Sequence, residues 1–186
     1  MKRQLITLLF LSALSFCAFA RQPQKGYRGF IDWSNSLRRE KWVTSTTCFH
    51  TGFSTSHGYQ INPWIFTGAG IDIEYDPNQH STICAFFAQG RTDLKFGRFT
   101  PFGDIRIGYN ASRGGGVYIS PTIGYRLNWG RKAAINIAAG LTLQGYTADI
   151  HDIVSDPETG GWTIGGKIGT RHGLTPFFSF RLGFDF

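Results

Sequence analysis

Apolar and polar residues alternate along most of this chain, and that alternation limits the possible folds more than any other feature. Residues 178–186 read FSFRLGFDF, so the even positions hold Phe or Leu and the odd positions hold Ser, Arg, Gly and Asp. An α-helix would spread these residues around its circumference, whereas a β-strand places the two sets on opposite faces. The same period of two recurs in residues 117–129 and 135–144. The chain is therefore predicted to be all-β.

Alternating segments divide the chain into eight expected strands. They are placed at residues 27–36, 42–56, 63–76, 81–95, 99–111, 116–129, 132–148 and 172–186. Residues 161–171 either extend the last strand or form a short hairpin arm. An alanine-rich helix at 133–140 is the competing interpretation, but the alternation of Ile135 and Ile137 favours a strand.

The connections between these strands alternate in length. Short turns are expected at residues 57–62, 95–99 and 129–132, and external loops at 35–41, 76–81, 111–116 and 147–171. Transmembrane barrels have short periplasmic turns and longer external loops. The pattern fits an even number of strands with both termini periplasmic.

Two features of the strand faces favour a membrane barrel over a soluble one. The polar faces are rich in small residues, in a chain with 24 glycines, whereas a surface facing water would favour Lys and Glu. Aromatic residues cluster at the predicted strand ends, as in the girdles of membrane barrels. They are Trp33, Trp42, Trp64, Tyr75, Tyr109, Trp129, Phe184 and Phe186. The prediction is an antiparallel up-and-down eight-stranded transmembrane β-barrel, with a soluble lipocalin-like or sandwich fold as the alternative.

Charged residues are expected inside this barrel. Lipid offers no hydrogen-bond partners to a sheet edge, so the sheet must close, and eight strands enclose a space that side chains just fill. The alternation places eight charged side chains on the face toward the barrel interior: Arg28, Asp32, Asp72, Glu74, Asp104, Arg106, Arg126 and Arg181. Ion pairing among these residues has to offset their desolvation. Such a packed lumen disfavours a diffusion porin.

Residues 1–20 have the basic start, apolar segment and A-x-A ending of a secretory signal peptide. Cleavage between Ala20 and Arg21 would leave one barrel domain over residues 21–186. A lipoprotein modified at Cys17 is the alternative, although a bulky Phe precedes this cysteine. In an exported chain, the net charge of +7 gives no argument for a nucleic-acid partner.

No cofactor or metal is expected from the remaining motifs. Cys48 and Cys84 lack the C-x-x-C spacing of metal and redox sites, and the sequence leaves open whether they form a disulfide. Residues 149–158 hold four carboxylates and a histidine but lack the spacing of a calcium loop, so a solvated loop is expected.

The chain ending in FRLGFDF resembles the small outer-membrane barrels of Gram-negative bacteria, including the OmpA-type transmembrane domain and its OmpX-like relatives. Residues 56–70, SHGYQINPWIFTGAG, resemble a segment of porin-like barrels of the Bacteroides type. The resemblance implies that the barrel-assembly machinery reads the terminal strand. Its signal would map to Phe180, Leu182, Phe184 and Phe186.

Some outer-membrane barrels are enzymes acting on lipid A or phospholipid, and these need a serine, a histidine and an acid within reach of one another. His172 is the best-placed candidate base, although Leu174 stands where the deacylase pattern has a serine. His50 could project inward, without an assignable acid partner. His57 is expected in a periplasmic turn.

The favoured function is therefore a non-enzymatic, monomeric barrel with a structural or surface-interaction role in the outer membrane. Its external loops, chiefly 35–41 and 147–171, are expected to contact lipopolysaccharide, host molecules or neighbouring proteins. Phosphates of lipopolysaccharide could be met by Arg38, Arg39, Lys41 and Arg113. A lipid-modifying enzyme and a small pore are the alternatives.

Overall fold

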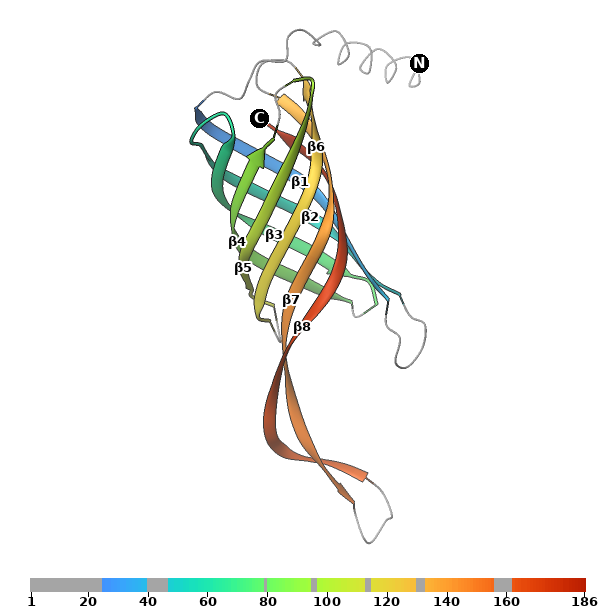
Figure 1. Ribbon diagram of the computed structural model, residues 1–186. Coiled ribbons are helices and arrows are strands. Elements are labelled where there is room, and N and C mark those ends of the chain that lie inside the picture. The colour runs from blue at the N-terminus through green and yellow to red at the C-terminus, as the bar shows by residue number, and fades with distance from the viewer. Residues whose placement is uncertain are drawn as a thin grey trace, which may run out of the picture.

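The computed structural model describes residues 25–39, 47–78, 80–94, 97–112, 115–129, 133–155 and 162–186. Eight strands form one sheet that closes on itself (Figure 1). They are β1 (Gly26–Arg39), β2 (Thr47–Gln60), β3 (Ile65–Asp76), β4 (Ser81–Asp93), β5 (Phe99–Asn110), β6 (Val117–Trp129), β7 (Ala133–Ser155) and β8 (Trp162–Asp185). The prediction of an eight-stranded antiparallel barrel is confirmed. No helix in these ranges is long and apolar enough to cross a membrane.

Closure depends on the pairing of the first strand with the last. Each strand pairs antiparallel with the strand that follows it, and the β1–β8 ladder runs from Phe30 opposite Asp185 to Leu37 opposite Phe178. Gly26 and Phe186 therefore lie at the same end of the barrel (Figure 1). Within the wall, the backbone N–H and C=O groups pair between strands, as a lipid environment requires.

Most large apolar side chains of the wall point outward, and the buried charged side chains point into the lumen. In β8, Phe178 is 54% exposed and Arg181 is 4% exposed, and Phe180, Leu182 and Phe184 share the outward face. A soluble barrel would have the opposite arrangement. The outward face is therefore the one that suits lipid.

The aromatic girdle prediction is wrong for Trp33. That residue was expected at a strand end, but β1 continues to Arg39, so Trp33 lies in the middle of the wall opposite Phe53 and Leu182. Its indole Nε1 donates to Thr51 Oγ1 at 3.0 Å, which satisfies the one polar atom of a side chain facing outward.

The position predicted for His57 is also wrong. Strand β2 extends to Gln60, so the turn to β3 spans only 61–64 and His57 lies within the strand on its outward face. The Tyr27 hydroxyl lies 2.5 Å from His57 Nδ1, and Thr55 Oγ1 lies 3.1 Å from Nε2. Each ring nitrogen of His57 therefore has a hydroxyl within hydrogen-bonding distance, although the ring lies on the face that meets lipid.

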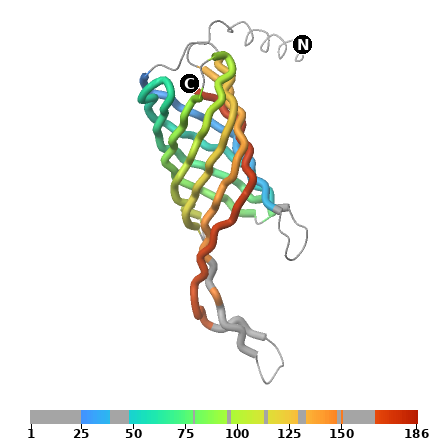
Figure 2. The backbone as a smooth tube through the Cα atoms, in the orientation of Figure 1, coloured from blue at the N-terminus to red at the C-terminus, as the bar shows by residue number. Residues whose placement is uncertain are grey.

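Residues 147–155 form a strand where a loop was expected, and residues 162–171 extend the last strand, as one of the two interpretations of residues 161–171 predicted. Strands β7 and β8 remain paired beyond the barrel, from Gly145 opposite Leu174 to Ser155 opposite Trp162, with a register shift near His151. This two-stranded segment, residues 145–155 and 162–174, is called the arm below. It projects from the end of the barrel opposite Phe186 (Figures 1 and 2). The helix considered at 133–140 is wrong, because these residues begin β7.

One break in the wall has a local cause. Pro121 has no N–H to donate, and the β6–β7 ladder is interrupted between Ile119 opposite Leu143 and Thr122 opposite Gly140. The hydroxyls of Ser120 and Thr142 lie 2.8 Å apart at this gap, on the lumen side. A side-chain contact thus joins the two strands where the backbone ladder does not.

Candidate functional site: the charged lumen

All eight charged residues expected in the lumen lie there, and none is more than 7% exposed. They come from β1, β3, β5, β6 and β8, where every second side chain faces inward. They gather into three clusters: one near Phe186, called the periplasmic cluster after the predicted orientation of the termini, a central cluster, and an outer cluster on the side of the arm.

The periplasmic cluster gathers three guanidinium groups around two carboxylates. Arg28 Nη2 lies 2.5 Å and Arg126 Nη2 lies 2.9 Å from Asp185 Oδ2. The same two arginines approach Asp93 Oδ2 at 3.5 and 3.6 Å, and Arg91 Nε lies 3.3 Å from Asp93 Oδ1. These contacts join β1, β4, β6 and β8 across the lumen.

Aromatic rings compensate for the excess positive charge of this cluster. The Arg91 guanidinium carbon lies 3.5 Å from the ring centroid of Phe102 and 5.0 Å from that of Phe30. A ring face attracts a cation, and more strongly where water is excluded. Phe66 packs edge-on against Phe30 at a centroid distance of 4.9 Å and fills the remaining space.

The central cluster is balanced in charge, with two guanidinium groups and two carboxylates. Arg106 pairs with Asp32 through Nη2, with Asp104 through Nε at 3.5 Å, and donates from Nη1 to Ser54 at 2.8 Å. Arg181 Nη1 donates to Asp104 Oδ1 at 3.1 Å. Each of these four charged groups therefore has at least one oppositely charged neighbour, as burial requires.

The outer cluster is acidic. Asp72 accepts hydrogen bonds from Ser34 at 3.2 Å and from Tyr118 at 3.0 Å. Beyond it lie Glu74 and Asp76, with His50 between them. The sequence alone could not assign an acid partner to His50. That partner depends on the register between β2 and β3, which only the structure gives.

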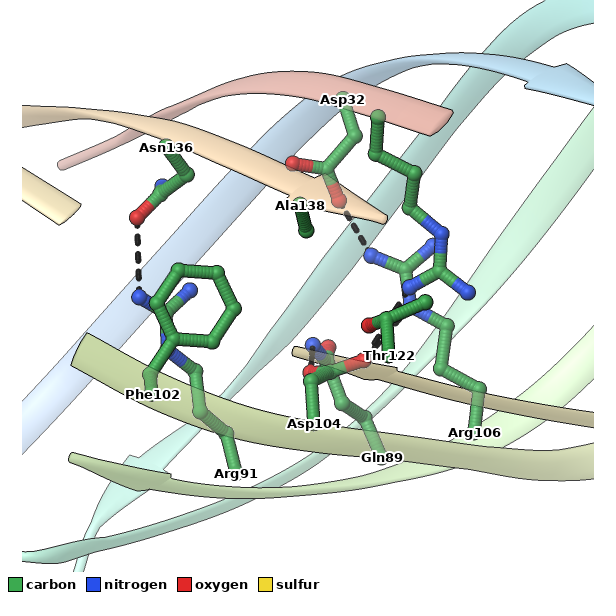
Figure 3. Close-up of a pocket in the computed structure, with 10 residues that line it drawn as sticks. Asp32, Gln89, Arg91, Phe102, Asp104, Arg106, Thr122, Asn136 and Ala138 are labelled. Carbon is green, nitrogen blue, oxygen red and sulfur yellow. Dashed lines mark hydrogen bonds and ion pairs between the residues drawn. The ribbon is translucent and has the colours of Figure 1, made fainter. Parts of the chain in front are cut away.

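Little space remains between the periplasmic and central clusters. A cavity lined by Gln89, Arg91, Phe102, Asp104 and Thr122, among others, measures about 10 Å³ (Figure 3). This volume is about the minimum for a single water molecule. A cavity of this size has no room for a column of water at this level of the described lumen.

Sequence reasoning missed several lumen residues: Asp76, Arg91, Asp93 and Asp185. Arg91 and Asp93 lie in β4, where the outward positions Ala88 and Thr92 are only weakly apolar, so the alternation is diluted. They could have been predicted from Gln89, because residues 89, 91 and 93 are two positions apart and therefore lie on the same face of the strand.

The candidate catalytic histidines do not complete a serine–histidine–acid set in the contacts of the described residues. His172 is exposed on the arm, and its Nδ1 lies 3.1 Å from Thr147 Oγ1. His50 has acids beside it, but Ser54 accepts from Arg106 instead. Ser45, another serine close to His50 in the sequence, lies outside the described residues.

The two cysteines do not form a disulfide. Cys48 shares the inward parity of His50, whereas Cys84 has the outward parity of Phe86, so the wall separates them. Within the part of the chain that the structure describes, no group of histidine, cysteine and acidic side chains could hold a metal ion.

Arg38, one of the residues expected to meet lipopolysaccharide phosphates, lies on the inward face of β1. Its guanidinium carbon lies 5.8 Å from the ring centroid of Phe177, which is buried on the inner face. The even residues of β1 point inward, and Arg38 follows that parity. Lys41 and Arg113 lie outside the described residues, as do Trp42, Ala20 and Arg21, and the structure does not describe the side chain of Arg39.

Comparison with known families agrees with this architecture. The model of the outer membrane protein beta-barrel domain matches residues 6–186. No curated protein matches the chain. The closed barrel with its apolar outer face and the match over nearly the whole chain lead to one conclusion. The chain belongs to the outer membrane protein beta-barrel domain family and is a protein of the outer membrane.

Proposed function

We propose that this protein is a non-enzymatic outer-membrane barrel whose arm is a surface for interaction with other molecules outside the cell. The observation that carries the proposal is the pair of strand edges on the arm. From Trp162 to Phe177, β8 pairs with β7 alone, because its ladder with β1 begins at Phe178. From Gly145 onward, β7 pairs with β8 alone, because its ladder with β6 ends at Gln144.

Unpaired strand edges are suited to binding. Their backbone N–H and C=O groups can pair with an added strand, and adjacent side chains can supply specificity. Large apolar side chains are exposed on the described part of the arm, among them Ile150 at 45%, Leu174 at 57% and Ile168 at 66%. Lys167, Arg171 and His172 add basic character to β8. These features suit an extended segment of a neighbouring protein or the phosphates of lipopolysaccharide.

The non-enzymatic part of the proposal is supported by the histidine contacts described above. The alternative, an enzyme acting on lipid A, requires His172 or His50 as a base. If the alternative were correct, overexpression would change the lipid A mass spectrum, and His172→Ala or His50→Ala would restore it. We expect identical spectra with and without overexpression.

We also infer the route to the membrane. Residues 1–20 would direct export and be cleaved after Ala20, and the outward set Phe180, Leu182, Phe184 and Phe186 would be read by the assembly machinery. The family resemblance supports both inferences. The barrel is proposed to be a monomer, because its eight strands close within one chain.

A shortened arm tests the proposal. Ala148 and Arg171 are opposite each other in the ladder, so residues 149–170 can be replaced by Asn-Gly, a sequence that favours a two-residue hairpin turn. We expect the shortened protein to fold, with the mobility shift between boiled and unboiled samples of a closed barrel. A photo-crosslinker at Leu174, present in both proteins, should give adducts in intact cells only with the full arm. Equal adducts from both proteins would contradict the proposal.

A further inference from the structure

His50 lies between two carboxylates at the outer end of the lumen. Its Nδ1 is 3.6 Å from Glu74 Oε2 and its Nε2 is 3.3 Å from Asp76 Oδ2. All three side chains are buried, and Nδ1 makes no hydrogen bond. Both ring nitrogens therefore face negatively charged oxygens in a poorly solvated space.

This geometry distinguishes the two charge states of the ring. A neutral imidazole carries one N–H and one lone pair, so one of its nitrogens would direct a lone pair at a carboxylate. An imidazolium carries two N–H groups and can be attracted by both carboxylates at once. Histidine is also the side chain that ordinarily changes charge between about pH 5 and 8.

The same residues connect strands that are not neighbours. Glu74 on β3 accepts hydrogen bonds from Ser36 of β1 at 3.1 Å and from Gln144 of β7 at 3.3 Å. The His50 ring lies 4.7 Å, centroid to centroid, from the ring of Phe177 on β8. Two further charged groups face this set: Asp72 of β3, which interacts electrostatically with Glu74, and Arg38 of β1, which lies over the same Phe177 ring.

Two of these contacts lie at the base of the arm. Gln144 is the last residue of β7 that pairs with β6, and Phe177 directly precedes the ladder of β8 with β1. Beyond these two residues the strands leave the barrel as the arm (Figure 1). A change in the charge of His50 therefore acts where the arm joins the wall.

We propose that His50, Glu74 and Asp76 form a proton-operated latch that fixes the base of the arm. With His50 protonated, the imidazolium draws the two carboxylates together, and Glu74 holds Gln144 while the ring packs on Phe177. On loss of the proton, one carboxylate faces a lone pair and the latch loosens. The latch is stable toward low pH and weakens as the pH rises. Its consequence for binding rests on the function proposed for the arm.

The test compares heat-unfolding midpoints of the full chain in detergent micelles at pH 5 and pH 8. For the unaltered protein we expect the midpoint to be higher at pH 5 by about 3 °C, the change that one modest interaction produces in a domain of this size. His50→Gln should abolish the difference. His57→Gln is the matched control, because it removes a histidine from the outward face of the same strand, and it should keep the difference. An unchanged difference in His50→Gln would overturn the latch.

A second readout addresses the arm directly. A spin label at Ile168, 66% exposed on the arm, should be less mobile at pH 5 than at pH 8. In His50→Gln its mobility should be the same at both pH values. A midpoint that shifts while the label does not respond would refute the connection to the arm. Neither readout uses a ligand, so failure of the binding proposal in the crosslinking experiment would be distinguishable from failure of the latch.

Discussion

At the scale of single residues, the lumen depends on charges that cannot be removed one at a time. Arg106 is 2% exposed and is the shared partner of Asp32 and Asp104. Losing one member of a buried pair leaves an uncompensated charge, which costs about 3–5 kcal/mol. Arg106→Met should therefore lower the free energy of unfolding by about that amount, measured by urea titration in micelles.

The control for this substitution is Arg171→Met, which removes an arginine from the exposed arm. A substitution at such an exposed position should change the free energy of unfolding by no more than about 0.5 kcal/mol. The double variant Arg106→Met with Asp32→Asn should recover part of the loss, because it removes one of the orphaned carboxylates. Equal stability of Arg106→Met and the unaltered protein would contradict the role given to this pair.

At the scale of elements, the wall requires glycine where neighbouring strands approach closely. A Cβ at Gly108 would lie 1.8 Å from the backbone oxygen of Phe86, so β4 and β5 would have to separate. Gly108→Ala should destabilise the barrel by about 2 kcal/mol. Gly90→Ala is the matched control, because its Cβ would meet only a side-chain carbon of Ile105 at 3.7 Å. Urea midpoints of the two variants measure the difference, and similar midpoints would contradict it.

The strands could be predicted from sequence because alternate residues face lipid and lumen. Lipid favours apolar side chains, whereas the lumen favours polar and charged ones. That rule finds β6 and the barrel part of β8, where Ile123 and Phe178 face outward between polar neighbours. It gives the arm only in part: an extended last strand was one interpretation of residues 161–171, but the seventh strand was expected to end at residue 148 and β7 continues to Ser155. It also ends β2 too early, because His57 is polar yet faces outward.

The lumen was predictable in its composition but not in its contacts. Alternation places Asp104 and Arg181 inside, but it does not determine that they meet 3.1 Å apart across the barrel. Such partners depend on the stagger between strands around the whole circuit, which no local pattern records. The placement of His50 between Glu74 and Asp76 has the same origin.

At the scale of the whole molecule, the described lumen is closed by its own side chains. The cavity between the periplasmic and central clusters measures about 10 Å³, and the Arg91 guanidinium group lies against the Phe102 ring in its lining. Together these features leave no continuous path for water at this level of the lumen. We expect conductance at the background level when the purified protein is added to planar bilayers, as with detergent alone. Reproducible stepwise currents would contradict this expectation.

The burial of Asp185 has a consequence for how the chain reaches its final state. This carboxylate is fully buried against Arg28 and Arg126, and it arrives only with the last strand. Until β8 docks, three guanidinium groups of the periplasmic cluster face the single carboxylate of Asp93. A barrel in which β8 had not yet docked would therefore carry surplus positive charge at this end, and docking of β8 would neutralise it. The closed barrel and a barrel that lacks a docked β8 would thus differ in the charge balance at this end of the lumen.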